Sequence, residues 1–306
     1  MRIKILSIFF LAIVAVACND DVFVTDFIPD KTEVTVAGDD GVVTVTTGSS
    51  AWDGFYIQTE MSDVTVSVEA DDDDRVKSIT CSTEWMGIRA ERVAGNKIEV
   101  RSLGNFTDRT FNFTLHFYSE WDSQDVKVEL TPESKSRILD VDFNLHGYEY
   151  YGSENVDIET VRVANTGEEN MRWTYDARPP LDMSVEFESW CPYLFDCIDY
   201  ENQMVEIPTF SNYFWGMDGV MVKFYPGVQN LSLDKWPNSP SALIVPPGIS
   251  ADVTIGCHYS DIAVDYTLTC ENPVTGRVRE IWGKARMRQP EFITVNYVVV
   301  SNALHF

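Results

Sequence analysis

The sequence predicts an all-β protein built from two tandem β-sandwich domains. The 306 residues include 38 aromatic ones (8 Trp, 13 Tyr and 17 Phe), together with frequent Val and Thr, the residue types that favour strands. Apolar and polar residues alternate in short segments bounded by turn residues, as half-buried antiparallel strands require. No segment after residue 17 has the spacing of an amphipathic helix. Hydrophobic residues make up 44% of the chain, which is enough for two cores.

Residues 1–17 have the pattern of a signal peptide. Arg2 and Lys4 precede an apolar run over residues 5–17, which only Ser7 interrupts. A helix of this length spans about 20 Å, whereas the hydrocarbon core of a bilayer is about 30 Å thick. A short apolar run after a charged start is typical of a cleaved export signal and not of a membrane span.

The residues Ala15-Val16-Ala17-Cys18 resemble the lipobox of bacterial lipoproteins. The resemblance implies cleavage before Cys18 and attachment of a diacylglycerol to its thiol, so that the chain is anchored to a membrane by lipid. The following Asn19-Asp20-Asp21 resembles the acidic export signal of Bacteroidetes surface lipoproteins, which implies an outer-membrane position facing the cell exterior. Residues 18–30 would then be an acidic tether. The alternative is an ordinary secreted protein with a cysteine at the cleavage site.

Residues 31–133 are expected to form an immunoglobulin-like sandwich, because about seven alternating strands occur in about a hundred residues. The apolar positions that alternate with polar ones are Val34, Val36, Val43, Val45, Val64, Val66, Val68, Ile98, Val100, Phe111, Phe113, Leu115, Phe117, Val126, Val128 and Leu130.

The second half of this domain resembles the BACON domain, an immunoglobulin-like module of Bacteroidetes glycan-handling proteins. The similar residues are Glu84-Trp85-Met86-Gly87-Ile88, the strand around Ile98-Glu99-Val100, and Gly104-Asn105-Phe106-Thr107-Asp108-Arg109-Thr110. The family usually has a glutamine after its last strand, where this chain has Thr131. The resemblance covers about fifty residues, and it implies a sandwich that often acts as a spacer.

A polar stretch over residues 131–136 separates the first domain from a larger β-sandwich at residues 138–306. One sandwich with insertions, or a jelly roll, fits the pattern of this region. A turn is expected at Tyr259-Ser260-Asp261, and residues 292–300 are expected to form a central strand because both faces are apolar. The strands expected here are Glu159–Ala164, Met171–Tyr175, Met183–Glu188, Val220–Phe224, Leu243–Val245, Asp252–Cys257, Val264–Cys270 and Phe292–Val300.

The cysteines after Cys18 number five. Cys257 and Cys270 lie on the apolar faces of their expected strands, too far apart in register for a disulfide, so we expect buried thiols. Cys191 and Cys197 flank Pro192 and either close a small disulfide loop or remain reduced. No cysteine or histidine spacing matches a zinc site.

No residue pattern in the chain indicates catalysis, a cofactor or a resident metal. The four histidines are scattered, and neither a Gly-x-Ser-x-Gly nor a His-Glu-x-x-His motif occurs. Asp71–Asp74 is expected to be a solvated loop, with calcium binding as the alternative. The net charge is −25, and it becomes −27 (21 basic minus 48 acidic residues) without Arg2 and Lys4. Such a chain repels phosphate backbones, so no nucleic-acid partner is expected.

Aromatic residues in expected loops are the candidate ligand-binding residues: Tyr148, Tyr150, Trp190, Tyr213, Trp215 and Trp236. Flat aromatic rings can stack on the C–H faces of sugars while neighbouring polar groups bind hydroxyls. For any single ring the alternative is packing in the core.

These features favour a surface-exposed, lipid-anchored protein that binds a glycan or another ligand without catalysis. A polysaccharide or an outer-membrane transporter complex would be its partner. The alternative is a fimbrillin-like adhesin or assembly subunit, in which the apolar segment Phe292–Val300 is donated to the open sheet edge of a neighbour. An enzyme ranks third, because no catalytic constellation is recognisable.

Overall fold

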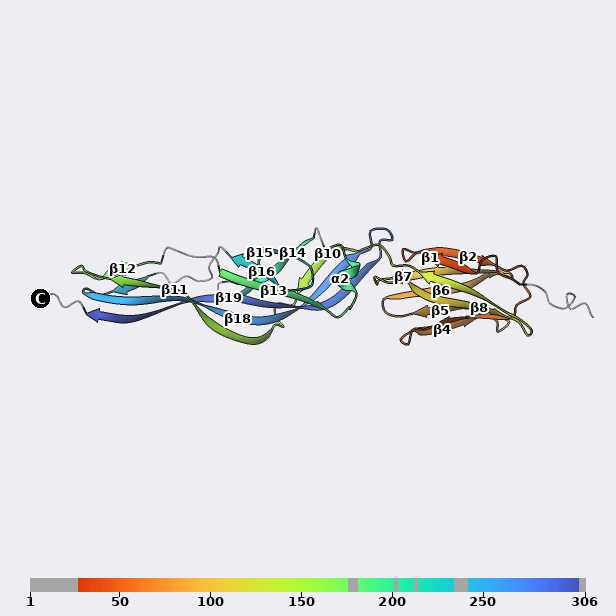
Figure 1. Cartoon of the computed structure of the whole chain (residues 1–306), viewed down its shortest axis with the longest axis horizontal. Helices are drawn as coiled ribbons and strands as arrows, with labels where there is room; N and C mark the ends of the chain where they lie inside the picture. Colours follow the sequence, from red (N-terminus) through yellow and green to blue (C-terminus); the bar gives the residue numbers. More distant parts are fainter. Residues whose placement is uncertain (1–26, 176–180, 201–202, 212–213, 234–241, 303–306) are drawn as a thin grey trace, which may run out of the picture. The chain divides into compact units, whose positions relative to one another are not determined.

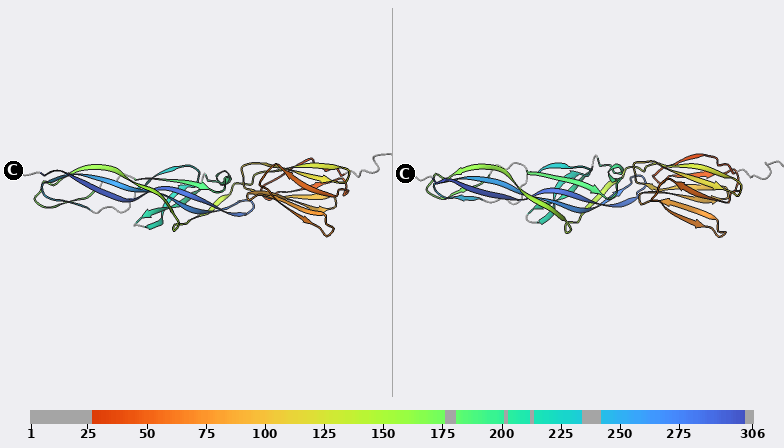
Figure 2. Two further views of the ribbon diagram at one scale, coloured as in Figure 1. Left: turned by 90° about the horizontal axis from the view of Figure 1, so that it is seen from below. Right: turned by 60° about the horizontal axis from the view of Figure 1, so that its bottom comes forward.

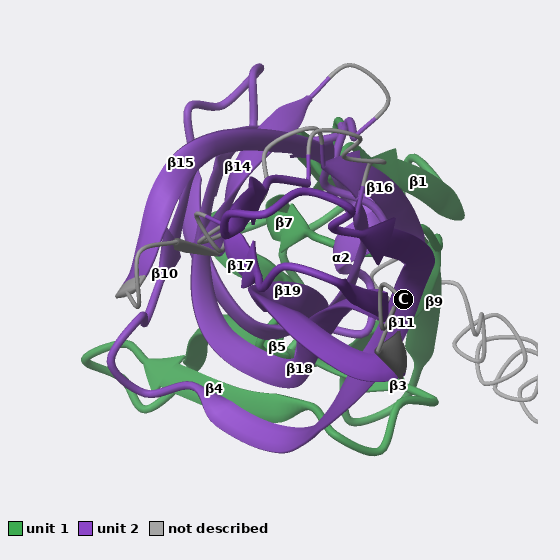
Figure 3. Ribbon diagram, turned by 90° about the vertical axis from the view of Figure 1, so that its left-hand side faces the viewer, with its two compact units in different colours: residues 1–134 green, residues 135–306 purple. Residues whose placement is uncertain are grey.

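The computed structural model describes residues 27–175, 181–200, 203–211, 214–233 and 242–302, and it confirms an all-β fold. The chain divides into two compact units, residues 1–134 and 135–306, which Figure 3 distinguishes by colour. One helix of four residues, α2 (Leu194–Cys197), is present in the described part of the second unit. No helix among the described residues is long and apolar enough to cross a membrane.

The first unit is a sandwich of two sheets, as expected. Its neighbouring strands are antiparallel except β1 and β9, which run parallel. The first sheet has the order β1 (Glu33–Val36), β9 (Ser123–Leu130), β8 (Phe111–Tyr118) and β3 (Gly54–Thr59). The second has the order β2 (Val42–Thr46), β7 (Lys97–Asn105), β6 (Met86–Ala94), β5 (Val76–Ser82) and β4 (Thr65–Ala70).

Trp52 lies in the core between these sheets. Its ring meets those of Phe55 and Phe117 edge-on at 6.1 and 5.3 Å between centroids. The indole N–H donates a hydrogen bond of 3.1 Å to the hydroxyl of Thr47, so the polar atom of this buried side chain is satisfied. The guanidinium carbon of Arg92 lies 3.4 Å from the indole centroid. The Trp52 ring therefore contacts a residue of the loop after β2 and residues of both sheets.

The second unit is organised around two very long antiparallel strands, β18 (Ile249–Glu271) and β19 (Val278–Asn302). They lie side by side along this unit in Figures 1 and 2. Strands β10 and β11 pair with successive parts of the free side of β18, and β13 pairs with β19 over residues 283–288. The remaining members of this sheet are β10 (Arg137–Phe143), β11 (Glu149–Ala164), β13 (Leu181–Ser189) and β16 (Gln229–Leu233).

The prediction of a turn at residues 259–261 is wrong. The chain continues through it as one strand, with only a register shift between His258 and Tyr259. The segment lacks glycine and proline, and Ser260 is buried between paired strands. Cys257 and Cys270 thus lie on one strand, thirteen residues and roughly 43 Å apart at 3.3 Å per residue, which excludes a disulfide between them. Both side chains are fully buried, as expected.

The turn that reverses the chain lies at residues 272–277 instead. The side-chain oxygen of the buried Asn272 accepts hydrogen bonds from the backbone N–H groups of Val274 (2.8 Å) and Thr275 (3.0 Å). Gly276 takes a φ of +72°, a conformation that L-residues rarely adopt, and its N–H donates to the carbonyl of Asn272 at 2.9 Å. This asparagine and this glycine explain why the reversal occurs here and not at residue 260.

Two short sheets complete the second unit. The pair β12 (Met171–Trp173) and β17 (Leu243–Val245) packs on the half of the long sheet that contains β11, around Val253 and Ile255. The pair β14 (Met204–Ser211) and β15 (Phe214–Lys223) belongs to the other half, where the Gln289 side chain donates to the Pro208 carbonyl at 2.7 Å. The larger sandwich is therefore one long sheet with two short sheets against it.

An aromatic cluster fills the core of the half nearer the 272–277 turn. Tyr266 contacts the rings of Phe143, Phe187 and Phe224 at centroid distances of 5.5–6.1 Å. Its hydroxyl donates a 2.9 Å hydrogen bond to the Glu188 carbonyl.

The segment expected to be a central strand, residues 292–300, is not central. It forms the last part of β19 and pairs with β18 on one side, whereas β13 reaches only to residue 288. Tyr297, Val298, Val299 and Val300 are all exposed. Apolar residues on both faces predict burial, but the core covers only Ile293 and Val295 of this segment and does not reach the residues after them.

Candidate functional site

Aromatic residues gather where β11 begins. Tyr148 lies just before this strand, and its ring meets that of Trp215 on β15 at 5.5 Å between centroids with a 52° tilt. The two residues are 67 positions apart in sequence, and the strands β11 and β15 beside them belong to different sheets. Tyr148, Tyr150 and Tyr151 are 45%, 58% and 54% exposed. Two of the predicted ligand-binding residues thus form a pair, and a third lies beside them in sequence.

Tyr151 belongs to a polar surface instead. Its hydroxyl donates a 2.5 Å hydrogen bond to the carboxylate of Glu149, and the guanidinium carbon of Arg286 lies 5.4 Å from its ring centroid. Glu149 also accepts a hydrogen bond of 2.8 Å from Lys284. Glu149 and Tyr151 therefore turn toward β19, whereas Tyr148 turns toward Trp215, as the alternation of side chains along a strand allows.

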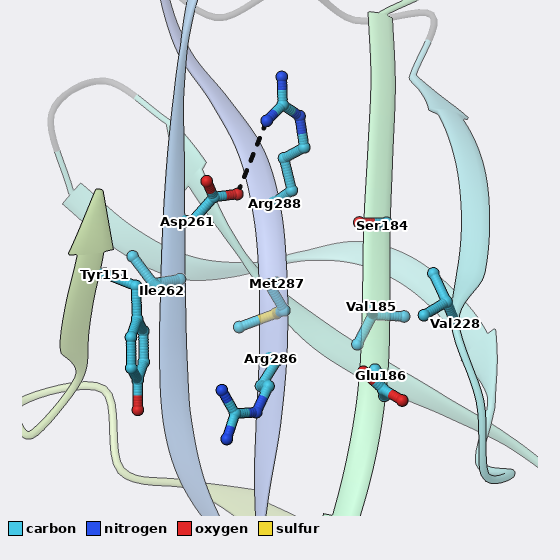
Figure 4. A pocket seen from close by; sticks show the side chains of 10 residues that line it. All are labelled: Tyr151, Ser184, Val185, Glu186, Val228, Asp261, Ile262, Arg286, Met287 and Arg288. Atoms are coloured by element: carbon cyan, nitrogen blue, oxygen red, sulfur yellow. Dashed lines mark ion pairs between the residues drawn. The ribbon is translucent and has the colours of Figure 1, made fainter. Parts of the chain in front are cut away.

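A row of three cations occupies the middle of β19. Lys284, Arg286 and Arg288 are two residues apart from one another, so they share one face of the strand. Arg286 and Arg288 line a shallow pocket of about 250 Å³ together with Tyr151, and Asp261 and Glu186 come from the strands on either side (Figure 4). In Figure 4, Arg286 and the ring of Tyr151 lie on one side of Met287 and the Arg288–Asp261 pair on the other.

Each of these cations is matched by a carboxylate on another strand. Arg286 forms an ion pair of 2.7 Å with Glu188 of β13. Arg288 hydrogen-bonds to Glu154 of β11, and its guanidinium lies 3.8 Å from Asp261. The surface is therefore dense in donors and acceptors. Its three cations are all paired, and the carboxylates Glu149, Glu154, Glu186, Glu188 and Asp261 outnumber them.

The pKa shifts follow from this pairing. The hydrogen bond from Lys284 holds the pKa of Glu149 below its usual value, and the same bond raises the pKa of Lys284. The hydrogen bond to Glu149 raises the pKa of Tyr151. All three shifts favour the charge states of neutral pH, in which Tyr151 donates and Glu149 accepts. The surface keeps its polar pattern over a wide pH range.

This arrangement is suited to recognition of a polar, uncharged ligand. It offers the exposed ring of Tyr151 beside hydrogen-bonding groups whose cations are already paired, whereas the Tyr148–Trp215 pair is turned to the other side of the strand. The residues that line the pocket include no cysteine, histidine or lysine, so neither of its hydroxyl groups, on Ser184 and Tyr151, has a histidine beside it in that lining. Over the described residues, no group of three or more His, Cys, Asp or Glu side chains is placed to hold a metal ion.

The acidic run at residues 71–74 is a turn. The Asp71 carboxylate accepts backbone hydrogen bonds from Asp73 (3.0 Å) and Arg75 (2.9 Å), and the Arg75 bond is the main reason why its pKa is lowered. The carboxylate thus stabilises the turn between β4 and β5.

The other predicted residues have different positions. Trp190 is 69% exposed in the loop after β13, where its backbone N–H donates to the Trp282 carbonyl at 3.1 Å, and Trp282 is itself exposed. Tyr213, Trp236 and the lipidation residue Cys18 lie outside the described residues. Lys284, Arg286 and Arg288 were missed, although their alternation in a chain poor in basic residues was a usable signal.

No protein-family profile and no curated protein matches the sequence. Among solved structures, the chain is similar to a lamprey immune protein (12% identity, TM-score 0.38, covering 86% of this chain and 88% of the other). It is also similar to an aerolysin-like protein of Bombina maxima (10%, TM-score 0.30, 53% and 97%) and to a putative pore-forming toxin from Bacteroides vulgatus (8%, TM-score 0.17, 91% and 93%). These neighbours are β-rich proteins, and likeness at this level assigns no function.

Proposed function

We propose that this chain is a surface-displayed lipoprotein whose second unit binds a glycan without catalysis. The observation that carries the proposal is the aromatic group at the start of β11: the Tyr148–Trp215 pair with the exposed Tyr150 and Tyr151. Such rings stack on sugar faces, and the Arg286–Glu188 pair beside Tyr151 offers hydrogen-bonding groups for sugar hydroxyls on the other side of the strand. A net charge of −25 disfavours an anionic polymer, so a neutral polysaccharide is the ligand class.

Display at the cell surface is the second part of the proposal. The lipobox-like segment before Cys18 and the acidic residues after it support a lipid anchor in the outer membrane that faces the exterior. The partial resemblance of the first unit to the BACON domain supports a spacer that holds the binding unit away from the membrane. An outer-membrane transporter complex would be a natural receiver of the bound glycan.

Affinity electrophoresis in gels that contain neutral polysaccharides tests the binding. We expect retarded migration on at least one glycan, and loss of that retardation in Tyr148→Ala and Trp215→Ala. Trp121→Ala is the matched control, because Trp121 is 79% exposed but lies in the first unit. Migration that no polysaccharide retards would refute the proposal, and so would a Trp121→Ala variant that loses binding as fully as the other two.

The assembly alternative remains a second candidate because of one observation. The apolar segment after residue 291 is already paired with β18, so it is not available for donation as a free strand. Among the described residues no strand pairs with its outer edge, and the side chains of Tyr297 to Val300 are exposed. Assembly would therefore use the edge of the strand in place.

A further inference from the structure

The last part of β19 is an open sheet edge. Residues 292–302 pair with β18 along one side, and among the described residues no strand pairs with their other side. The strand β13 that continues the sheet ends its pairing at Arg288. Figure 1 shows the end of β19, in dark blue, at the border of the sheet beyond the reach of β13. An unpaired edge of this length presents a row of backbone donors and acceptors that another strand can satisfy.

The composition of this edge lacks the usual protection against pairing. Residues 292–302 contain no charged residue and no proline in a chain with 71 charged residues. Tyr297, Val298, Val299 and Val300 are 58%, 69%, 48% and 48% exposed, so apolar side chains project from both faces. The opposite edge strand β11 carries five charged residues, and its net charge of −3 discourages pairing there. Only one of the two outer edges is therefore suited to association.

We propose that this edge of β19 pairs with the same segment of a second copy, antiparallel and about a twofold axis. Two strongly acidic chains repel one another at most surfaces, and a charge-free edge removes that repulsion where the backbones meet. Antiparallel self-pairing with the twofold axis at Val299 sets Val299 opposite its own copy on one face and Val298 opposite Val300 on the other. Pairing with β11 of another copy would instead place these valines beside carboxylates.

This inference goes beyond the proposed glycan binding and does not depend on it. The aromatic group at Tyr148 and Trp215 contains none of the residues of the β19 edge. Dimer formation and glycan binding can therefore fail separately, and each has its own measurement.

Sedimentation of the chain from Asn19 to Phe306, which keeps every described residue, tests the association. We expect a concentration-dependent dimer, and we expect Val298→Lys to raise its dissociation constant at least tenfold because the twofold axis places two new ammonium groups close together. Val274→Lys is the matched control, since Val274 is 65% exposed in the 272–277 turn. Both variants should have the circular dichroism of the parent chain, which shows that any change in the dissociation constant does not result from misfolding. A monomer at all concentrations up to about 100 μM, or equal weakening by both substitutions, overturns the proposal.

Cross-linking decides the geometry. Single cysteines introduced in turn at positions 296–299 are treated with a short bismaleimide, while the five cysteines of the body are buried and protected. In a twofold antiparallel pair only the positions nearest the axis face their own copies, so one or two variants should cross-link strongly. Cross-linking at all four positions would show parallel pairing, and cross-linking at none would show a different contact; either result overturns the proposed geometry.

Discussion

Gly283 supports the aromatic core of the second unit, and its replacement by alanine is a sharp test of the fold. Gly283 pairs with Tyr266 on β18 and with Ser189 on β13. A Cβ atom at this position would overlap the backbone oxygen of Glu188 and the ring and hydroxyl of Tyr266. The glycine is present because the tyrosine ring lies across it, an arrangement known from cross-strand aromatic–glycine pairs.

The cost of Gly283→Ala can be estimated from these contacts. Overpacking of a well-packed site costs about 1–3 kcal/mol, and the upper part of that range applies because one of the overlapped atoms belongs to the backbone. Displacement of Tyr266 also weakens its 2.9 Å hydrogen bond to the Glu188 carbonyl, which adds about 1 kcal/mol. We therefore expect a loss of about 3 kcal/mol in the free energy of unfolding. For a domain of this size that loss lowers the Tm by about 6–12 °C.

Thermal unfolding followed by near-UV circular dichroism measures this loss in the second unit. Gly216→Ala is the matched control, because Gly216 also lies in a strand but its added Cβ would meet no atom within 4 Å. We expect the control to stay within about 0.5 kcal/mol of the parent chain. A Gly283→Ala variant whose Tm matches that of the control would refute the packing of Tyr266 over Gly283.

Three further predictions concern ionisation, the first unit and the turn. Burial raises the pKa of Cys257 and of Tyr259 to about 12 from ordinary values of 9.0 and 10.0. Their neutral forms therefore stabilise the folded state fully below about pH 9, and this contribution is lost as the pH rises to 12. We expect the urea midpoint of unfolding to fall between about pH 9 and 12, and to fall less steeply in Cys257→Ala. Asn105→Ala should lower the free energy of unfolding by about 2–3 kcal/mol. The Asn105 amide donates hydrogen bonds to the carbonyls of Arg109 (2.8 Å) and Leu130 (3.3 Å), and both carbonyls would lose a buried donor. Chemical denaturation measures this loss, and a value below about 1 kcal/mol would contradict the prediction. Asn272→Ala should lower the free energy of unfolding by about 1–2 kcal/mol, and Asn272→Asp should lower it less. Only the aspartate carboxylate can still accept hydrogen bonds from the two backbone N–H groups of the turn. Equal losses in the two variants would argue against a role of this side chain in stabilising the turn.

Local patterns in the sequence predicted part of the first unit, but they missed β3 and β5, and Val66 and Val68 of β4 are exposed. Alternation of apolar and polar residues placed strands such as residues 111–117 and 126–130, and nearly all of their apolar members are buried. The pattern works there because each strand buries one face, so the period of two is visible in the residue types.

The second unit was less predictable for two physical reasons. The polar segment at residues 259–261 is compatible with a turn by composition, and only the pairing of β18 with strands on both sides keeps it extended. The apolar segment at residues 292–300 has the composition of a buried strand, but the core covers Ile293 and Val295 and does not reach Tyr297 to Val300. Both outcomes depend on residues distant in sequence, which local composition does not report.

For the candidate site, too, the residue types are visible in the sequence but the contacts between distant residues are not. Tyr148 and Trp215 are recognisable by residue type and by their place in expected loops, but their contact joins two sheets and positions 67 residues apart. The cation row on β19 is visible in the sequence, yet the carboxylates that pair with it come from β11, β13 and β18 and are not.

The length of the β18–β19 hairpin has a consequence for how the second unit folds. Its first contacts, Glu271 with Val278, close a loop of only a few residues, and each later pair adds to a ladder that is already formed, up to Ile249 with Asn302. Such a hairpin can form progressively from the 272–277 turn, so the closure of long loops does not limit its growth. The end farthest from the turn is then the last to form and the first to open during hydrogen exchange. That end contains Tyr297 to Val300, so the segment best able to pair with another chain is also the last to become ordered.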